Sequence, residues 1–139
     1  MKKFFAIIAI LAITVFAAAV CTADELVANP TCQDFSGQWE GTFNTGQGKA
    51  QSRGDISMTC ICEKNGKITF TLSRISGNYG QVSISGSKLT ASRTAREDVI
   101  QLYKKADGKM VIKGEYTRLG GSKQSYSSAG GTYILEKKK

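Results

Sequence analysis

The 139-residue sequence predicts an all-β protein: a single antiparallel up-and-down β-barrel of about eight strands. Two observations lead to this fold class. From residue 35 onward, short segments alternate apolar and polar residues, which is the period of a strand. Glycine-containing turn signals separate these segments at spacings near ten residues. Because closing such a meander removes its two unpaired edges, a barrel is favoured over the alternative, a two-sheet β-sandwich.

The strands are expected in the following order. The first covers Phe35 to Phe43, with Trp39 on its inner face, and the second runs from Ile56 to Cys62. Asn65-Gly66 predicts a two-residue hairpin turn, because both residues accept positive φ, and Asp107-Gly108 predicts another. The other strands are expected around Ile68–Leu72, Val82–Ile84, Leu89–Ala91, Ile100–Leu102, Met110–Ile112 and Gly131–Glu136. No helix and no second domain are expected.

The N-terminus has the layout of a secretory signal peptide. Lys2 and Lys3 precede an apolar stretch that ends in small residues at positions 17–19. We therefore expect a cleaved signal peptide (1–19, with cleavage after residue 23 as the alternative), an N-terminal arm (20–34) and a barrel domain (35–139). The mature protein is then secreted or periplasmic, without a transmembrane segment. The alternatives are an uncleaved anchor, shorter than the roughly 20 residues of a membrane span, and a lipid anchor on Cys21.

Charge and composition exclude some chemistry and favour certain partners. The chain has no histidine, so histidine catalysis and histidine metal ligation are excluded. Without Lys2 and Lys3 it has 17 basic and 11 acidic residues, a net charge of +6. This charge predicts attraction to an anionic surface or glycan, or it serves solubility alone.

The four cysteines, Cys21, Cys32, Cys60 and Cys62, predict structural disulfides. If residues 43 and 55 pair, position 36 lies opposite 62 and 38 opposite 60, so Cys32 passes close to both Cys60 and Cys62. If Cys21 is retained, Cys21 and Cys32 are each expected to bond to one of that pair. A loop of about 30 residues closed in this way contributes about 3 to 4 kcal/mol. No metal site is expected, because zinc needs about four ligands at suitable spacing.

An eight-stranded barrel has room for a filled core or for one small ligand. Both readings stay open here. The candidate lining of a ligand cavity consists of bulky inward-facing positions: Phe43, Met58, Phe70, Leu72, Ile84, Leu102, Met110 and Ile112.

No catalytic set is evident, and no cofactor is expected. The acids Glu40 and Glu115 fall on outer faces, while Asp55, Glu63, Glu97, Asp98 and Asp107 fall at strand ends and are expected at the surface. A hydrolase using lysine or carboxylate chemistry is the enzymatic alternative.

Several tyrosines and arginines could form an aromatic and basic surface for nucleic acid or glycans. They are Tyr79, Tyr103, Tyr116, Tyr126, Arg74, Arg93, Arg96 and Arg118. Their dispersed spacing disfavours nucleic acid as a partner.

The segment Phe35-Ser36-Gly37-Gln38-Trp39 resembles the Gly-x-Trp signature of calycin barrels, the lipocalin and avidin group. In that group the tryptophan packs across one barrel end, and the other end opens to a ligand. The resemblance implies that Gly37 and Trp39 are a barrel-end packing element, and it assigns no ligand contact. The sequence departs from the group in lacking a Thr-Asp-Tyr-like turn and in having a single tryptophan.

The sequence therefore predicts a binding protein rather than an enzyme. The expected ligand is small and apolar or amphipathic. The alternative is an interaction protein that acts through its surface, or through the segment 119–130, on an anionic envelope component, a glycan or a partner protein. The sequence does not indicate an oligomeric state.

Overall fold

The computed structural model of this chain describes residues 23–45, 52–75, 77–118 and 130–139. The predicted signal peptide (1–19), its cleavage site after residue 19 and Cys21 lie outside the described residues, as do residues 119–129, which include Tyr126. Within the described ranges, no helix is long and apolar enough to span a membrane.

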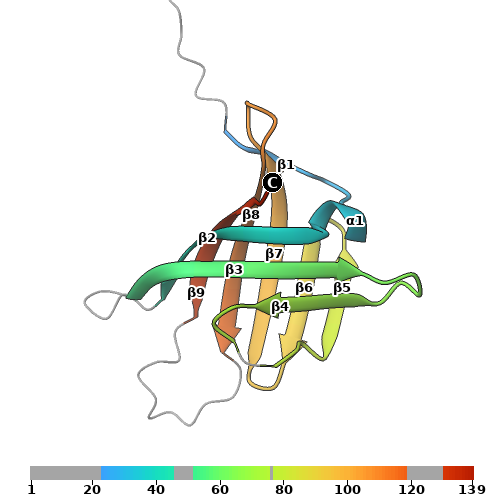
Figure 1. The fold of residues 1–139 in the computed structure, drawn as a ribbon, viewed down its shortest axis with the longest axis vertical. Coiled ribbons are helices and arrows are strands. Elements are labelled where there is room, and N and C mark those ends of the chain that lie inside the picture. Colours follow the sequence, from blue (N-terminus) through green and yellow to red (C-terminus); the bar gives the residue numbers. More distant parts are fainter. Residues whose placement is uncertain (1–22, 46–51, 76, 119–129) are drawn as a thin grey trace, which may run out of the picture.

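Eight strands form a nearly closed antiparallel up-and-down barrel, as predicted (Figure 1). They are β2 (Gly37–Thr45), β3 (Ser52–Cys62), β4 (Ile68–Leu72), β5 (Gln81–Ser85), β6 (Lys88–Arg93), β7 (Arg96–Lys104), β8 (Met110–Arg118) and β9 (Gly131–Lys137). Strands adjacent in sequence are adjacent in the sheet, and β9 pairs with β2. One continuous hydrogen-bonded path therefore includes all eight strands, which excludes a sandwich of two separate sheets.

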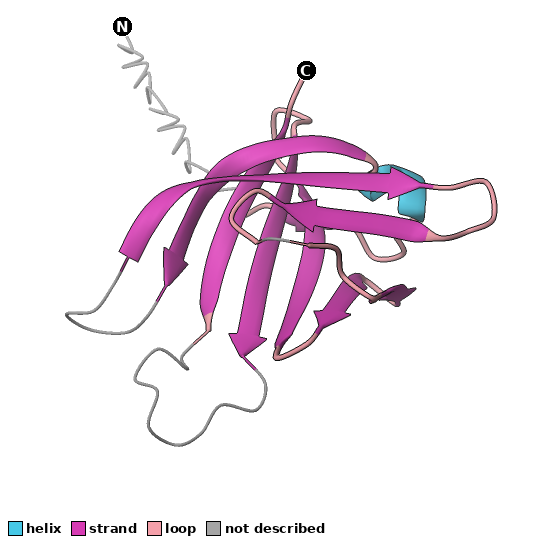
Figure 2. Ribbon diagram, turned by 60° about the horizontal axis from the view of Figure 1, so that its bottom comes forward, coloured by secondary structure: helices cyan, strands magenta, loops and turns pink. Residues whose placement is uncertain are grey.

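The barrel has a seam between β4 and β5, the two ends of this hydrogen-bonded path. The rings of Phe70 on β4 and Tyr79 before β5 meet edge to face, with centroids 4.9 Å apart. Figures 1 and 2 show β2, β3 and β4 crossing over β5–β9, so that the strands curve around a common interior. Aromatic packing thus joins the two edges where backbone pairing ends.

The register of the first hairpin differs by one residue from the prediction. Phe43 lies opposite Gly54, not residue 55, and Gly37 lies opposite Cys60. Directly opposed residues share a face of the sheet, and Phe43 is buried whereas Asp55 is exposed. The predicted register would have paired an inward side chain with an outward one.

The two predicted glycine turns are present but contain an extra residue. Glu63 N donates to Lys67 O at 2.9 Å, and Lys105 N donates to Lys109 O at 2.8 Å, so each loop has three residues. Gly66 and Gly108 have φ of 83° and 85°, whereas Asn65 and Asp107 have no positive φ. A turn followed by a left-handed glycine is the common three-residue hairpin loop.

Two short elements were not predicted. Cys32–Phe35 forms a one-turn helix, α1, so the expectation of no helix is wrong there. The Asp34 carboxylate accepts hydrogen bonds from Thr31 N at 2.7 Å and Thr31 Oγ1 at 2.9 Å, which stabilise the start of this turn. Glu25–Leu26 forms β1 and pairs with β7 at Tyr103 and Lys104, beyond the point where β6 pairing ends at Gln101.

The barrel interior is one hydrophobic core, and all eight predicted inward positions belong to it or pack against it. Six are buried: Phe43, Met58, Phe70, Leu72, Leu102 and Ile112. Ile84 and Met110 are partly buried and pack against the cluster. The inner faces are therefore as predicted, while the role of these residues in binding a ligand stays a prediction.

Candidate functional site

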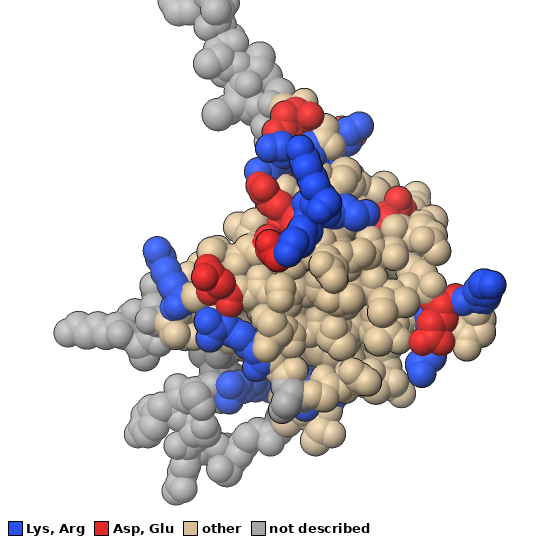
Figure 3. Space-filling model, viewed as in Figure 1, with Lys and Arg blue, Asp and Glu red and all other residues tan. Residues whose placement is uncertain are grey.

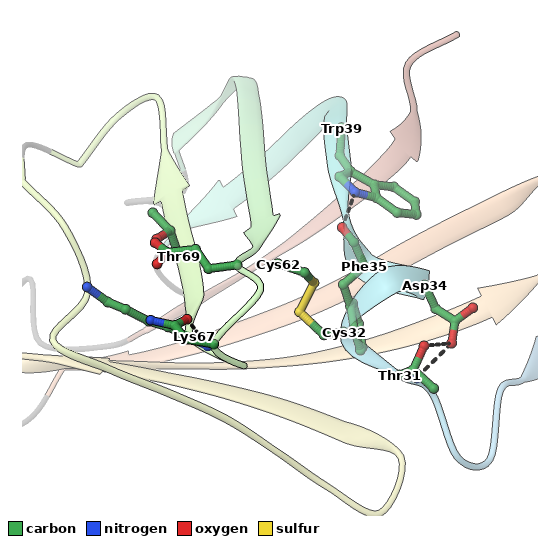
Figure 4. Close-up of a disulfide and its surroundings, with 10 residues drawn as sticks. Thr31, Cys32, Asp34, Phe35, Trp39, Cys62, Lys67 and Thr69 are labelled. Carbon is green, nitrogen blue, oxygen red and sulfur yellow. Dashed lines mark hydrogen bonds between the residues drawn. A yellow bond between two sulfur atoms is a disulfide. The ribbon is translucent and has the colours of Figure 1, made fainter.

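The two ends of the barrel differ in composition. We call the end that contains α1 and the turns 63–67, 86–87 and 105–109 the disulfide end. Figure 4 shows its main contacts: Cys32 is bonded to Cys62, with Cα atoms 5.9 Å apart, which confirms one of the predicted disulfide pairings. Trp39 is fully buried, and its indole Nε1 donates to Phe35 O at 2.8 Å. The helix, the indole and the disulfide together cover this end.

Gly37 connects α1 to β2 with a φ of 119°, a conformation that a residue with a Cβ rarely adopts. It therefore allows the chain to turn from the helix into the strand two residues before Trp39. The sequence signature Gly-x-Trp thus corresponds to a local geometry in which glycine sets the turn and the tryptophan enters the core.

Cys60 is buried and has no disulfide partner among the described residues, so the predicted second disulfide stays a prediction. It faces the core opposite Gly37, whereas Cys62 lies two residues further along β3, bonded to Cys32. Burial raises the pKa of the Cys60 thiol to about 11. Its predicted partner, Cys21, is outside the described residues.

We call the opposite end the arginine end, because all five arginines of the chain lie there. They are at the start of β3, after β4, at the end of β6, at the start of β7 and at the end of β8: Arg53, Arg74, Arg93, Arg96 and Arg118. The described lysines lie instead in the half of the barrel toward the disulfide end: Lys64, Lys67, Lys88, Lys104, Lys105, Lys109, Lys113, Lys137, Lys138 and Lys139. In Figure 3, charged side chains gather near the strand ends, and few lie over the middle of the β2–β4 face.

Aromatic rings accompany the arginines. Three guanidinium groups lie over rings: Arg96 over Tyr116 at 3.8 Å, Arg74 over Phe43 at 4.5 Å and Arg93 over Tyr79 at 5.8 Å. Such contacts attract a cation to the face of a ring. Arg74 is also held by its Nε, which donates to Asp55 O at 2.7 Å.

A fully buried carboxylate, Asp98, lies directly inside this end. It accepts hydrogen bonds from Arg96 Nε at 2.7 Å and Arg96 Nη2 at 3.0 Å. It also accepts from the hydroxyl groups of Tyr79 at 2.8 Å and Tyr133 at 2.9 Å. We call these four residues the Asp98 cluster.

The surface position predicted for Asp98 is therefore wrong. Asp98 has the same strand parity as Ile100 and Leu102, which are buried in the core, so its side chain faces inward. The alternation of apolar and polar residues along this strand is the sequence signal that could have predicted an inward-facing Asp98. A carboxylate on the inner face needs partners to offset its desolvation, and Arg96, two residues earlier on the same strand, is one of them.

The protonation of the Asp98 cluster follows from its burial. Burial, together with the neighbouring Asp98 charge, raises the pKa of both Tyr79 and Tyr133 well above the usual value. Burial opposes the charged form of Arg96, but its hydrogen bonds with Asp98 and the carboxylate charge raise its pKa overall. The tyrosines are thus neutral donors and Arg96 is a cation held in place by Asp98.

Glycines make room for the two tyrosine rings that line this region. A Cβ at Gly114 would lie 2.1 Å from the Tyr133 ring, and a Cβ at Gly131 would lie 2.7 Å from the Tyr116 ring. Each glycine is the direct cross-strand neighbour of the tyrosine whose ring covers it. Pairing a glycine with an inward aromatic residue therefore packs large rings close to the backbone.

The structure brings together part of the predicted aromatic and basic set. Six members lie at the arginine end: Arg74, Arg93, Arg96, Arg118, Tyr79 and Tyr116. The two tyrosines are buried, whereas Arg74 and Arg118 are exposed. Tyr103 lies elsewhere, with Lys113 Nζ 4.4 Å from its ring centroid. Sequence reasoning missed Tyr133 and Asp98. Among the described residues, no group of three or more His, Cys, Asp or Glu side chains is placed to hold a metal ion.

Fold and site together define a small, nearly closed, eight-stranded antiparallel barrel with an arginine-rich end and, among the described residues, one disulfide. No family model matches the chain, and comparisons with curated proteins and with solved structures found no match.

Proposed function

We propose that the protein is an exported, calycin-like barrel that binds a small amphipathic ligand at the arginine end. The observation that supports this most is the asymmetry of the barrel. One end is covered by α1, Trp39 and the disulfide, while the other has aromatic rings and guanidinium groups at its rim.

The chemistry of the arginine end suits an amphipathic molecule. Ligand sites combine apolar and aromatic walls with a few placed polar groups. Phe43, Tyr79 and Tyr116 retain 8%, 6% and 6% exposure, whereas Leu102 and Ile112, further inside, retain none. A ligand entering here would therefore meet the rings and the guanidinium groups before the core.

Export is supported by the disulfide and by the leader. A disulfide between Cys32 and Cys62 is consistent with an oxidising compartment. Residues 1–19 have the composition of a signal peptide. Attachment to a membrane through a lipid on Cys21 is the alternative form of the same proposal.

The calycin-like assignment is supported by the eight-strand meander and by Gly37 and Trp39. The strand order matches an up-and-down barrel, and the tryptophan is buried next to the helix that precedes the first barrel strand. The proposal extends this likeness to a ligand site at the far end.

Native and denatured mass spectrometry of the protein from its own cells tests the proposal. We expect a chain that starts at residue 20, or one lipidated at Cys21, with a non-covalent small molecule bound. A Tyr116→Ala variant should lose that molecule, and a Tyr103→Ala variant, away from the site, should keep it. The proposal fails if no molecule is bound and no amphiphile added afterwards raises the melting temperature.

A second candidate function uses the same end without an interior ligand. Arg53 and Arg118 are exposed at the arginine end, so an anionic envelope component or a glycan could dock on the rim. Binding to anionic vesicles that weakens with salt, in the absence of any small-molecule adduct, would favour this candidate.

A further inference from the structure

The seam between β4 and β5 is where apolar residues of the barrel interior are partly exposed. Among the described residues, six apolar side chains pack against the core but are only partly buried. Four of these six lie on β5, on β4 or directly after β4: Ile68, Ile75, Val82 and Ile84. By contrast, Leu89 and Ala91, the inward residues of the neighbouring strand β6, are buried. The missing pairing at the seam therefore leaves apolar surface open to solvent.

The two strands at the seam contain no charged residues. β4 has the sequence Ile-Thr-Phe-Thr-Leu and β5 has Gln-Val-Ser-Ile-Ser. Each of the other six barrel strands contains at least one Lys, Arg, Asp or Glu. Edge strands of soluble proteins usually carry charges or proline, because these residues prevent pairing with another chain. The composition of β4 and β5 therefore does not protect their free edges.

The edge of β5 is more open than that of β4. Phe70 and Leu72 on β4 are buried, whereas both inward residues of β5, Val82 and Ile84, are partly exposed. The glycines on either side of β5, at positions 80 and 86, lie in open space, because a Cβ built on either one would meet no other atom within 4 Å. A second strand therefore has room to approach both ends of β5.

The sequence around β5 is symmetric about Ser83. Residues 80–86 read Gly-Gln-Val-Ser-Ile-Ser-Gly, so each direction from Ser83 gives a β-branched residue, a polar uncharged residue and a glycine. In an antiparallel pair of two identical strands centred on Ser83, Val82 of one copy lies opposite Ile84 of the other. Apolar residues then share the inner face, polar residues share the outer face, and no like charges are opposed. This symmetry makes a second β5 the best matched strand that the described chain offers.

We propose that β5 pairs antiparallel with β5 of a second copy of this chain, with the two-fold axis at Ser83. Such pairing gives hydrogen-bond partners to the free edge of β5 and covers Val82 and Ile84. Symmetric dimers commonly use the same patch on both subunits. An edge of five residues is a small interface, so the dimer is weak and reversible. The inference does not depend on the proposed ligand, because β5 belongs to the wall of the barrel.

Sedimentation velocity of the mature protein without ligand tests the pairing. The average mass should rise from that of a monomer toward that of a dimer as the concentration increases from about 10 µM to about 1 mM, the range of weak association. Over the same range, ¹H–¹⁵N spectra should change at the amides of Gln81–Ser85 and stay constant at those of Gly131–Lys137. A monomer at the highest concentration, or changes centred away from β5, overturns the proposal.

Charge variants at the two-fold axis test the register. Ser83 is exposed, and Ser83→Lys or Ser83→Glu each places two like charges directly opposite one another in the dimer. Each variant alone should dimerise about five- to tenfold more weakly than the wild type, and an equimolar mixture should form the mixed dimer. Thr132→Lys is the matched control, because it adds the same charge to an exposed position on β9, a strand that is paired on both sides. It should dimerise like the wild type.

The remaining outcomes contradict the proposal in different ways. Dimers that are unchanged in both Ser83 variants lie at another surface. Weaker dimers that are not restored by mixing the two variants exclude a two-fold axis at Ser83. An equal loss in Thr132→Lys shows that net charge, and not the β5 edge, governs association. A wild-type monomer that binds an extended peptide of another protein at β5 shows that the edge serves a different partner, so self-pairing is wrong.

Discussion

The disulfide end and the arginine end are both formed by strand termini around one interior, yet they use different interactions. The disulfide end uses a covalent bond and a fully buried indole, and some of its surface charges form ion pairs. The arginine end contains a buried ion pair and a row of like charges. Buried ion pairs contribute little net stability compared with apolar packing. The comparison indicates that the interactions of the disulfide end stabilise the fold. The arginine end instead keeps a buried ion pair and opposed arginines, which a core selected for stability alone does not need.

The largest expected effect comes from breaking the Asp98 cluster. Asp98→Asn removes the negative charge but not the shape, so Arg96 is left partly buried without its counter-ion. We expect the free energy of unfolding in urea to fall by about 3 to 5 kcal/mol. Glu115→Gln, on the outer face of the adjacent strand, should change it by less than about 0.5 kcal/mol. A similar small change for both variants would contradict the role given to the cluster.

Removing the Cys32–Cys62 disulfide should lower the free energy of unfolding of the protein nearly as much. Replacing both Cys32 and Cys62 by serine frees a loop with a sequence separation of 30 residues, which should cost about 3 to 4 kcal/mol. Cys60→Ala, which removes a cysteine without breaking the disulfide, is the matched control. Ligand affinity at the arginine end should not change in the folded double variant. If affinity falls with stability, the two ends are not independent.

Alkaline pH should lower the stability of the fold, because the two tyrosines of the Asp98 cluster must be protonated in the folded state. Because the pKa values of Tyr79 and Tyr133 are raised in the folded state, the unfolded chain releases these protons first, near pH 10. Stability is therefore complete below about pH 10 and falls as pH rises above it. Tyr133→Phe should cost about 1.5 to 3 kcal/mol at neutral pH, since it removes a hydrogen bond to a charged group.

Melting temperatures between pH 8 and 11 measure this effect. The decline should be shallower in Tyr133→Phe than in the wild type, and Tyr103→Phe, outside the Asp98 cluster, should follow the wild type. Cys60 adds a smaller decline of the same sign between pH 9 and 11, because burial raises its pKa from 9.0 to about 11. Parallel curves for all variants would show that the tyrosines are not responsible.

The smallest effect is expected at the exposed ion pairs of the disulfide end. Lys138→Gln separates a pair in which both side chains are about half exposed, and solvent screens such pairs strongly. We expect no measurable change in melting temperature or in ligand affinity. A clear loss of affinity would mean that the lysine half of the barrel also contacts the ligand.

Much of the fold was predictable because local patterns determine it. Alternation from residue 35 onward located every barrel strand, although Phe35 itself lies in α1, and the positions of Gly66 and Gly108 located two hairpins. The expected proximity of Cys32 to the end of β3 predicted a disulfide with Cys60 or Cys62, and the structure has the bond to Cys62, even though the assumed register was wrong by one residue. These features depend on neighbours in sequence or on a single hairpin.

The site was less predictable because it depends on contacts between distant strands. The carboxylate of Asp98 is stabilised by Tyr79 and Tyr133, which are 19 and 35 residues away. From sequence alone, a charged residue at a strand end is predicted to be exposed, because the partners that would stabilise it in the interior are not known. The arginines were recognised as a set, but their arrangement as a row required the register of β6, β7 and β8.

The measurement that tests the two-ended account most directly is a two-dimensional ¹H–¹⁵N NMR titration of the mature protein with dodecyl phosphate. The account predicts shifts of the side-chain Nε–H signals of Arg93, Arg96 and Arg118 and of the Gly131 amide, while the indole Nε1–H of Trp39 stays in place. Shifts centred on Trp39 and the lysine half of the barrel, with the arginine signals unmoved, would contradict it.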